Sequence, residues 1–533
     1  MDRRQFLVMA GRIGLGSGLA SMAAACAPSG PIPIPPSSPG PGQTSPPSGA
    51  PAGPPVAPQP SASRDSTVAE ENRRIGSRGW DLRGAGGTPT AELFVDAASV
   101  APGDVLNLHL RSATQSTIEW YRLGWYGGSG GRLVRIDRSV APSAAGPAII
   151  DPVSGRTEAP DPVAVSVTIP TDWPSGLYLA VARPQAGAPA RTPFSVRNAP
   201  GGPVAPILFV SAAATWQAYN AWGGADFYDA STADTPDEAS GRRVVQVSFD
   251  RPHLLWHGAG LMPRWELPFV RWQERHGRFV DYCADVDLEL HPEVLGGRRL
   301  IVFAGHHEYW SRPMRAALEL AIANGVNVAF LSANEIYWQV RLESSPLGPG
   351  RRITCWKSRH GDPLMSTQPA LTTCRWREQP VDDPEAVIIG QMYGHVVRRP
   401  ADWIVAGSGH WLYEGTRLHD GDRLVNLVGQ EYDTYFPEYA PAGTTILARS
   451  PVQAVIRVGR GGGQPLEPRI QTATVYAAES GATVFAAGTF QWSWALDGYG
   501  SRSYRGFATP RDPRVERITA NLFDRLGDGP AVV

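Results

Sequence analysis

The sequence predicts an α/β domain, with a parallel sheet flanked by helices, that follows an all-β sandwich. Three observations predict this arrangement. The chain has 533 residues, more than one ordinary core accommodates. Apolar residues alternate with period two from about residue 91 to residue 196, and from about residue 207 short apolar strands alternate with amphipathic helical segments. We therefore expect two folded domains, at residues 85–198 and 204–530.

Composition limits the class of partner. Lysine and arginine number 49 against 50 aspartates and glutamates, so the net charge is −1. This balance argues against nucleic acid as the main partner and favours a small molecule or another neutral ligand. The 17 tryptophans suit an aromatic-walled cleft and equally a large aromatic core.

The first 26 residues resemble an export signal. Arg3 and Arg4 precede Phe6 and a weakly hydrophobic run of glycine and alanine that ends in three alanines before Cys26. This is the pattern of a twin-arginine signal with a lipoprotein cleavage box, although Ala23 stands where such boxes usually carry leucine. We expect export and lipidation at Cys26, with the protein on the outer face of the cytoplasmic membrane or secreted. An uncleaved anchor is the alternative, and the glycines disfavour it.

Residues 27–63 are rich in proline, serine and glycine and contain almost no charge. Such a segment cannot bury a core, so we expect a disordered tether. Because no later stretch is long and apolar enough to span a bilayer, we expect membrane contact only through the N-terminal lipid.

The first folded domain is expected to be a sandwich of immunoglobulin-like size. Its period-two runs are Leu106 to Leu110, Val163 to Ile169 and Leu177 to Val181. Turn signals rich in glycine and proline separate the runs, and no helical pattern lies between them.

The second domain shows the strand and helix alternation of a parallel sheet. Ser311 is the expected N-cap of a helix whose first turn contains Pro313. The stretch from 350 to 470 reads as irregular insertions with some β-structure. The expected strands cover residues 207–210, 279–283, 300–303, 326–331 and 483–487, and helices are expected at 266–277 and from 313 to about 323.

Polar and aromatic residues follow four of these strands. Because parallel strands share one carboxyl edge, we expect these side chains to converge on one site. The candidate catalytic residues are His306, His307, Glu308 and Glu335, Tyr309 is the candidate metal ligand, and the candidate substrate-pocket residues are Trp216, Asn220, Trp222, Asn334 and Gln491.

Several chemistries are excluded by missing patterns. Ser311 stands where a zincin would need its second histidine, and the chain has neither a Gly-x-Ser-x-Gly elbow after a strand nor a glycine-rich phosphate loop. A helix start in which Tyr309 only packs is the alternative for the His306 segment. In an oxidising compartment, Cys355 and Cys374 are a candidate disulfide, which leaves Cys283 free.

Six short runs stand in an order that is typical of one family: Thr215–Gly224, Val247–Pro252, Leu267–Trp272, Gly305–Ser311, Asn334–Trp338 and Ala486–Trp494. Together they resemble the large (beta) subunit of N,N-dimethylformamidase and its relatives. The resemblance implies a class I glutamine amidotransferase-like fold and a mononuclear iron, held by two tyrosines and a glutamate, that activates water to hydrolyse a small amide.

Tyr309 matches one of the implied tyrosine ligands, and Tyr282 is a stand-in for the second. The segment that matches the family's glutamate, Leu371 to Trp376, has no carboxylate, so Glu308 or Glu335 would replace it. Phenolate and carboxylate suit ferric iron.

The leading hypothesis is a lipid-anchored extracytoplasmic hydrolase that acts on a C–N bond of a small amide. Glu308 or Glu335 would then be a ligand or general base, and His306 or His307 would position substrate or transfer protons. The alternative is a non-catalytic cell-surface protein that binds a neutral ligand such as a glycan. Neither a homo-oligomer nor a small partner subunit, which the formamidase has, follows from the sequence.

Overall fold

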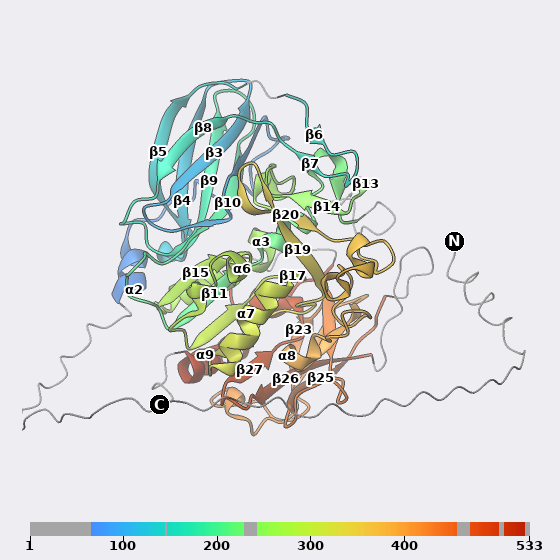
Figure 1. Cartoon of the computed structure of the whole chain (residues 1–533). Helices are drawn as coiled ribbons and strands as arrows, with labels where there is room; N and C mark the ends of the chain where they lie inside the picture. Colours follow the sequence, from blue (N-terminus) through green and yellow to red (C-terminus); the bar gives the residue numbers. More distant parts are fainter. Residues whose placement is uncertain (1–65, 144–145, 229–241, 456–468, 500–505, 528–533) are drawn as a thin grey trace, which may run out of the picture. The chain divides into compact units, whose positions relative to one another are not determined.

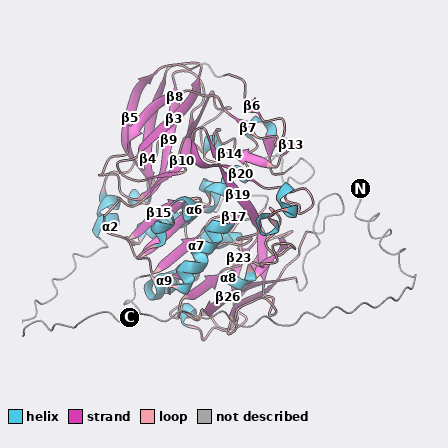
Figure 2. Ribbon diagram, in the orientation of Figure 1, coloured by secondary structure: helices cyan, strands magenta, loops and turns pink. Residues whose placement is uncertain are grey.

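The computed structural model describes residues 66–143, 146–228, 242–455, 469–499 and 506–527, all within one compact unit, Pro60–Val533. The expected signal, the tether and Cys26 lie outside the described residues. Within the described part of the chain, no helix is long and apolar enough to cross a membrane. The molecule is a mixed α/β protein with many strands and few helices (Figures 1 and 2).

The N-terminal part begins with helix α2 (Ser66–Arg73) and continues as two mostly antiparallel sheets that share a core. Leu106, Leu108 and Leu110 of β3 are buried in that core, as their alternation predicts. One sheet has the order β1-β3-β8 and the other β2-β10-β9-β4-β5. Their bounds are β1 (Ala91–Val95), β2 (Ser99–Val100), β3 (Val105–Ser112), β4 (Ser116–Leu123), β5 (Gly131–Val140), β8 (Val163–Thr168), β9 (Gly176–Pro184) and β10 (Ala190–Val196). A small ribbon of β6 (Ile149–Ile150) and β7 (Thr157–Glu158) lies between β5 and β8 in the chain.

Strand β9 is buried on both faces. A period-two apolar pattern predicts instead that one face of the strand is buried and the other is exposed. Tyr178, Ala180 and Ala182 point into the core between the two sheets. Leu177, Leu179 and Val181 instead belong to the large core of the α/β part. The most conspicuous apolar alternation of this strand therefore faces the second domain.

The second part is built on a seven-stranded sheet with the order β15-β11-β16-β18-β27-β26-β25. The first five strands run parallel, β26 is antiparallel to β27, and β25 is antiparallel to β26. All five strands predicted from the sequence are present in it: β11 (Ile207–Ser211), β15 (Val280–Ala284), β16 (Leu300–Phe303), β18 (Asn327–Phe330) and β27 (Thr483–Ala486), and β25 (Thr445–Pro451) and β26 (Ile470–Ala477) complete it.

In chain order the five parallel strands are arranged 2-1-3-4-5. This order places a topological switch point between β11 and β16, where the connections leave toward opposite sides of the sheet. The mixed α/β class is thus confirmed, whereas the immunoglobulin-like and glutamine amidotransferase-like assignments remain predictions from the sequence.

The predicted helices are present with small shifts of their ends. Helix α5 (Leu267–Arg275) precedes β15, and α7 (Arg312–Ala323) joins β16 to β18. The Ser311 hydroxyl accepts a hydrogen bond of 3.2 Å from the Met314 amide, so Ser311 is the N-cap. Helices α3 (Ala213–Ala218) after β11, α4 (Met262–Trp265), α6 (Asp287–Leu290), α8 (Ala386–Ile389) and α9 (Pro513–Leu526) complete the longer helical elements.

The predicted loop after β16 is partly a strand. Tyr309 to Ser311 form β17, which pairs in parallel with β19 (Trp338–Ser345). In this pairing Tyr309 lies opposite Trp338. Strand β19 continues into an antiparallel pairing with β20 (Gly348–Thr354), and β20 pairs with β14 (Gln246–Ser248). The stretch that reads as irregular insertions contains two further ribbons, β21 (Met392–Val396) with β24 (Glu431–Thr434) and β22 (Ala401–Ile404) with β23 (Arg423–Val428). A short parallel pair of β12 (Ala225–Asp226) and β13 (Arg242–Arg243) lies before β14.

Buried charges join the sandwich to the α/β part. Arg122 of β4 and Glu274 of α5 are both fully buried and form an ion pair of 2.7 Å. Arg351 of β20 pairs with Asp250 at 2.8 Å and donates to the Val95 carbonyl at 2.9 Å. These contacts satisfy charges that burial would otherwise leave without partners.

Candidate active site

The candidate site lies at the switch point of the seven-stranded sheet. Helix α3 follows β11 and ends at Tyr219, and the segment after β16 carries Glu308 and Tyr309. Because β11 and β16 are neighbours, the two segments leave the same edge side by side. Ligands of open α/β sheets bind at such points.

Three tyrosines and Glu308 form one hydrogen-bonded group, and we call these four residues the tyrosine cluster. The Tyr219 hydroxyl donates to Glu308 Oε2 at 2.7 Å. The Tyr228 hydroxyl lies 3.2 Å from both Glu308 oxygens and 2.7 Å from the Tyr219 hydroxyl. Tyr309 completes the set with a hydroxyl 2.6 Å from that of Tyr228. Four oxygen-bearing side chains from three segments are therefore linked, with Tyr219 and Tyr228 bonded directly to the carboxylate and Tyr309 linked to it through Tyr228.

Burial controls the protonation of the cluster. Tyr309 is fully buried and Glu308 is 3% exposed, whereas Tyr219 and Tyr228 are half-buried. Desolvation raises the pKa of the Glu308 carboxyl above its usual value, and nearby Lys357 opposes that rise. Desolvation and the Glu308 charge together raise the phenol pKa values of all three tyrosines well above the usual range. The phenols are thus neutral donors unless a cation replaces their protons.

Lys357 brings a cation to the same place. Its Nζ lies 3.4 Å from the centroid of the Tyr228 ring and 5.0 Å from that of Trp338. Burial lowers the pKa of this ammonium to about 8, and Glu308 partly offsets the effect. Lys357 also has a φ of 50°, a left-handed conformation that is uncommon for a non-glycine residue. A lysine with such a pKa is suited to proton transfer near neutral pH.

The donor chemistry of the tyrosine cluster fits the implied ferric ion. Phenolates and a carboxylate are hard anionic oxygen ligands, and such a cation would displace the protons that now link them. No group of three or more histidine, cysteine, aspartate or glutamate side chains that could hold a metal is found among the described residues. The potential ligands in the tyrosine cluster are three phenol oxygens and one carboxylate.

The paired histidines face different ways, as their adjacency predicts. His306 Nε2 lies 3.4 Å from Glu308 Oε2 and 3.4 Å from Asn334 Nδ2. His307 points away from the cluster, and its Nδ1 lies 3.9 Å from Asp285 Oδ2. Desolvation lowers the pKa of His306 well below its usual value and that of His307 to about 3, so both rings are neutral. Only His306 is placed to act with Glu308.

Glu335 holds the loop that carries His307. Its carboxylate accepts a hydrogen bond of 3.0 Å from the His307 amide, and burial raises its pKa well above the usual value. The residues on either side, Asn334 and Ile336, have φ values of 56° and 52°. A β-branched residue in the left-handed region is strained, and such strain concentrates at functional sites. The structure assigns Glu335 to the shape of the His307 loop and not to the hydrogen bonds of the tyrosine cluster.

The other predicted pocket residues mostly hold the surrounding loops. Trp216 donates from Nε1 to the buried Glu266 carboxylate at 3.1 Å. Asn220 donates to the Pro252 carbonyl at 2.9 Å, and Trp222 donates to Glu92 of the sandwich at 3.0 Å. Gln491 accepts from Thr509 at 2.9 Å. Of the substrate-pocket candidates, only Asn334 has a hydrogen bond to a residue that contacts the cluster.

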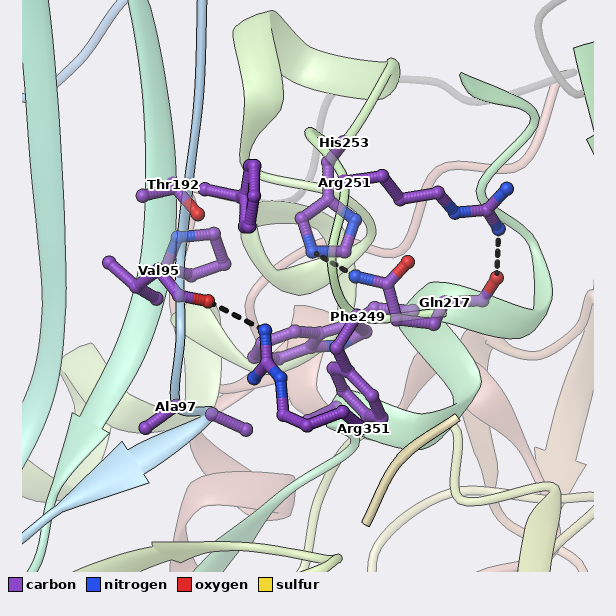
Figure 3. A pocket seen from close by; sticks show the side chains of 13 residues that line it. Val95, Ala97, Thr192, Gln217, Phe249, Arg251, His253 and Arg351 are labelled. Carbon is purple, nitrogen blue, oxygen red and sulfur yellow. Dashed lines mark hydrogen bonds between the residues drawn. The ribbon is translucent and has the colours of Figure 1, made fainter. Parts of the chain in front are cut away.

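A pocket of about 340 Å³, including the open space at its mouth, lies beside α3 between the sandwich and the second domain (Figure 3). Trp216 and Gln217 line it together with Val95 and Thr192 of the sandwich. Figure 3 shows its polar groups bonded to one another: Gln217 contacts His253 at 3.3 Å, and Arg351 donates to the Val95 carbonyl. Because these groups are paired and the tyrosine cluster is not in its lining, we do not assign the chemistry to this pocket.

Two expectations need correction. Tyr282 is not at the tyrosine cluster: it is buried on β15, and its hydroxyl donates to Glu274 at 2.8 Å. Cys355 and Cys374 are free buried thiols, as is Cys283. The sulfurs of Cys355 and Cys374 contact different main-chain carbonyls, of Gln339 and Glu378.

Three residues of the site are missed by sequence reasoning. Tyr219 lies in the polar and aromatic run that follows β11, and this position at a strand end could have identified it as a site residue. Tyr228 and Lys357 come from segments that no strand assignment connects with the sheet edge. Only the fold brings them to Glu308.

Comparisons with known proteins agree with the resemblance seen in the motifs. The family model described as N,N-dimethylformamidase beta subunit-like, C-terminal, matches residues 117–505. The N,N-dimethylformamidase beta subunits of Paracoccus aminophilus and of an Alcaligenes species are each 25% identical to this chain, over 345 and 344 residues. Each match covers 57% of this chain and 43% of the relative's length, so the chain aligns with less than half of those proteins.

Among solved structures, a cycloisomaltooligosaccharide glucanotransferase from a Paenibacillus species, complexed with cycloisomaltoheptaose, matches with 14% identity and a TM-score of 0.14. The match covers 38% of this chain and 28% of that one, and a score this low carries no argument. The family model, in contrast, spans well over half of the chain and includes every residue of the tyrosine cluster. The chain therefore belongs to the N,N-dimethylformamidase beta subunit-like family.

Proposed function

We propose that this protein is an amide hydrolase that cleaves the C–N bond of a small molecule at the tyrosine cluster. The observation that carries the proposal is the hydrogen-bonded group in which Tyr219 and Tyr228 contact the Glu308 carboxylate and Tyr309 contacts Tyr228, beside Lys357. Buried ionisable groups with shifted pKa values are typical of catalytic sites, and switch points of open α/β sheets are where ligands bind. The relatives' name, N,N-dimethylformamidase, supports the same bond type.

Glu308, Tyr219 and Tyr228 are the residues that would hold a mononuclear iron. Glu308 hydrogen-bonds to both tyrosines, so the oxygens of these three residues already surround one point. Tyr309, the ligand implied by the resemblance, contacts them through Tyr228 and would join or orient the set. Bound there, a ferric ion supplies Lewis acidity that polarises a carbonyl or acidifies water.

The chain's own side chains would bind water and move protons around the amide. Neutral His306 lies beside Glu308, and its Nε2 accepts from Asn334 Nδ2, so the ring would position water or substrate through its remaining N–H while the Glu308 carboxylate would accept a hydrogen bond from the attacking water. Addition of water to the carbonyl carbon and rupture of the C–N bond leave an amine that must gain a proton. Lys357, which is protonated below about pH 8, is placed to donate it.

The burial of the cluster favours a small substrate. Tyr219, Tyr228, Trp338 and Lys357 are half-buried, whereas Glu308 and Tyr309 are buried. A carboxylate enclosed by half-buried rings would suit a compact, uncharged amide. A glycan-binding surface, the alternative, would instead expose its aromatic faces and would need no buried carboxylate with a lysine beside it.

We further propose that the enzyme works outside the cytoplasm, anchored through lipid on Cys26. The twin arginines and the alanines before Cys26 support this location. In cells that process lipoproteins, the Cys26→Ser variant would lose incorporation of labelled fatty acid. Incorporation equal to wild type would contradict the proposal.

Metal analysis of the purified full chain tests the site. We expect about one iron per chain and a visible charge-transfer absorption from tyrosinate bound to ferric iron. Tyr228→Phe should lose the absorption and most of the iron. Tyr178→Phe is the matched control, because its buried hydroxyl bonds only to the Pro174 carbonyl, at 2.7 Å, among the described residues. Full-length protein without iron or another transition metal, yet active, would overturn the assignment of the ligands.

A further inference from the structure

A second cavity lies away from the tyrosine cluster and shares no residue with it. Its volume is about 630 Å³, including the open space at its mouth. Four separate stretches of chain line it: the segment at Arg78 to Arg83, the β4–β5 connection at Ser129, helix α5 at Arg271, and the segment at Tyr499. We infer that this cavity binds the oxyanion group, carboxylate or phosphate, of a small molecule.

The first line of support is the positive charge of the residues that line the cavity. Arg78, Arg83 and Arg271 line the cavity against a single aspartate, Asp81. Adding Asp497, which pairs with Arg271, still leaves one positive charge in excess. Arg78 is exposed and forms no ion pair with any described residue. The cavity therefore presents a positive field to a ligand.

The second line of support is Arg271, which is buried and uses only one of its guanidinium nitrogens in hydrogen bonds within the described part of the chain. Its side chain is 9% exposed, and Nε donates to Asp497 Oδ1 at 2.9 Å. Its two terminal nitrogens form no hydrogen bond with the described residues. A Cβ added at Gly130 would lie 2.5 Å from one of these nitrogens, so the glycine keeps the space that the guanidinium occupies. A buried guanidinium with free terminal donors is suited to a bidentate oxyanion.

The neighbouring contacts hold this geometry in place. Arg83 forms a two-point pair with Asp81, at 2.9 and 2.6 Å, and stacks 3.7 Å from the centre of the Tyr499 ring. Arg271 lies 5.4 Å from the centre of the same ring. Trp80 also packs against this ring, with the two ring centroids 5.6 Å apart, so the Tyr499 ring already has aromatic and cationic neighbours that hold it in place. Recognition would thus depend on charge and hydrogen bonds, which favours an oxyanion over an aromatic or neutral compound.

Titration calorimetry of the purified full chain, at fixed ionic strength, tests the inference with two probes, inorganic phosphate and succinate. We expect saturable binding of at least one probe, and which probe binds distinguishes a phosphate ligand from a carboxylate ligand. Loss of one charge-assisted hydrogen bond should weaken binding about tenfold in Arg78→Gln. Arg271→Gln should weaken it further.

Arg138→Gln is the matched control, because Arg138 is an exposed arginine of β5 that does not line the cavity. Should Arg271→Gln fail to fold, the exposed Arg78 variant still decides the outcome. The inference is overturned if neither probe binds saturably, or if Arg78→Gln binds as tightly as wild type. Equal weakening in Arg78→Gln and Arg138→Gln would also overturn it, since it would reflect general charge. Iron content and amidase activity do not enter this measurement, so its failure would leave the proposed function untouched.

Discussion

The Tyr219 hydroxyl donates a 2.7 Å hydrogen bond to Glu308 Oε2, although the two residues stand 89 positions apart in the chain. Tyr219 ends the helix after β11, and Glu308 follows β16. The bond therefore crosses the switch point of the sheet and ties together the two segments that leave it. It also makes Glu308 the centre of the site, since Tyr228 and Trp338 direct their donors to the same carboxylate.

Replacing Glu308 should abolish both the iron and the reaction. Glu308→Ala removes the carboxylate that Tyr219 and Tyr228 both contact, and we expect activity on a small amide to fall at least about 100-fold with loss of bound iron. Activity assays and metal analysis of the same preparation check this. The control is Glu319→Gln, whose side chain is 46% exposed on α7. Undiminished iron in Glu308→Ala would exclude this carboxylate as a ligand.

The activity should decline as the pH rises through about 8. Burial lowers the pKa of Lys357 to about 8, and its protonated form is the proton donor in the proposed reaction, so activity is retained below that pH and lost above it. Lys357→Met should lower kcat roughly 100-fold and remove this alkaline decline. The pH dependence of kcat measures both effects. An alkaline decline that persists unchanged in Lys357→Met would assign it to another group.

The stability should decrease with rising pH because of Glu266. This carboxyl is fully buried and accepts from the Ala212 amide and from Trp216, and burial raises its pKa to about 8. A raised pKa means that the folded state keeps the proton longer than the unfolded chain. The stabilisation is therefore full below about pH 4.5 and is lost as the pH rises through about 8.

Glu266→Gln should flatten this pH dependence, because an amide can still accept the hydrogen bonds and does not ionise. Urea unfolding between about pH 5 and pH 8.5 should show a smaller loss of unfolding free energy than in wild type, by a few kcal/mol at most. Glu119→Gln, at a partly exposed surface pair, should keep the wild-type slope. Identical slopes for wild type and Glu266→Gln would show that other carboxyls dominate.

The junction between the sandwich and the α/β part should depend on Arg122. Arg122→Met would leave Glu274 buried without its partner, which typically costs about 3–5 kcal/mol of unfolding free energy. Chemical denaturation measures the loss. Arg183→Met breaks a pair whose side chains are 34% and 19% exposed, and it should cost about 1 kcal/mol or less. Equal losses would contradict a special role for the buried pair.

Local patterns were sufficient for the elements of the α/β part. The apolar runs at Leu300 and Thr483 became β16 and β27, and the Ser311 and Pro313 signals located the start of α7 within a residue. These predictions succeed because capping and strand burial depend on neighbours close in sequence. The same reasoning fails for β9, where Leu177 and Leu179 face the second domain, because which face meets which core is a long-range property.

The sequence by itself determined the family, the mixed α/β class and the position of Glu308 and Tyr309 at a strand end. Only the tertiary structure decided that Tyr219, Tyr228 and Lys357 join them, that Tyr282 does not, and that Cys355 and Cys374 remain free thiols. The physical reason is that hydrogen bonds between side chains depend on distances that the strand order sets. A switch point between β11 and β16 brings together residues that no local pattern relates.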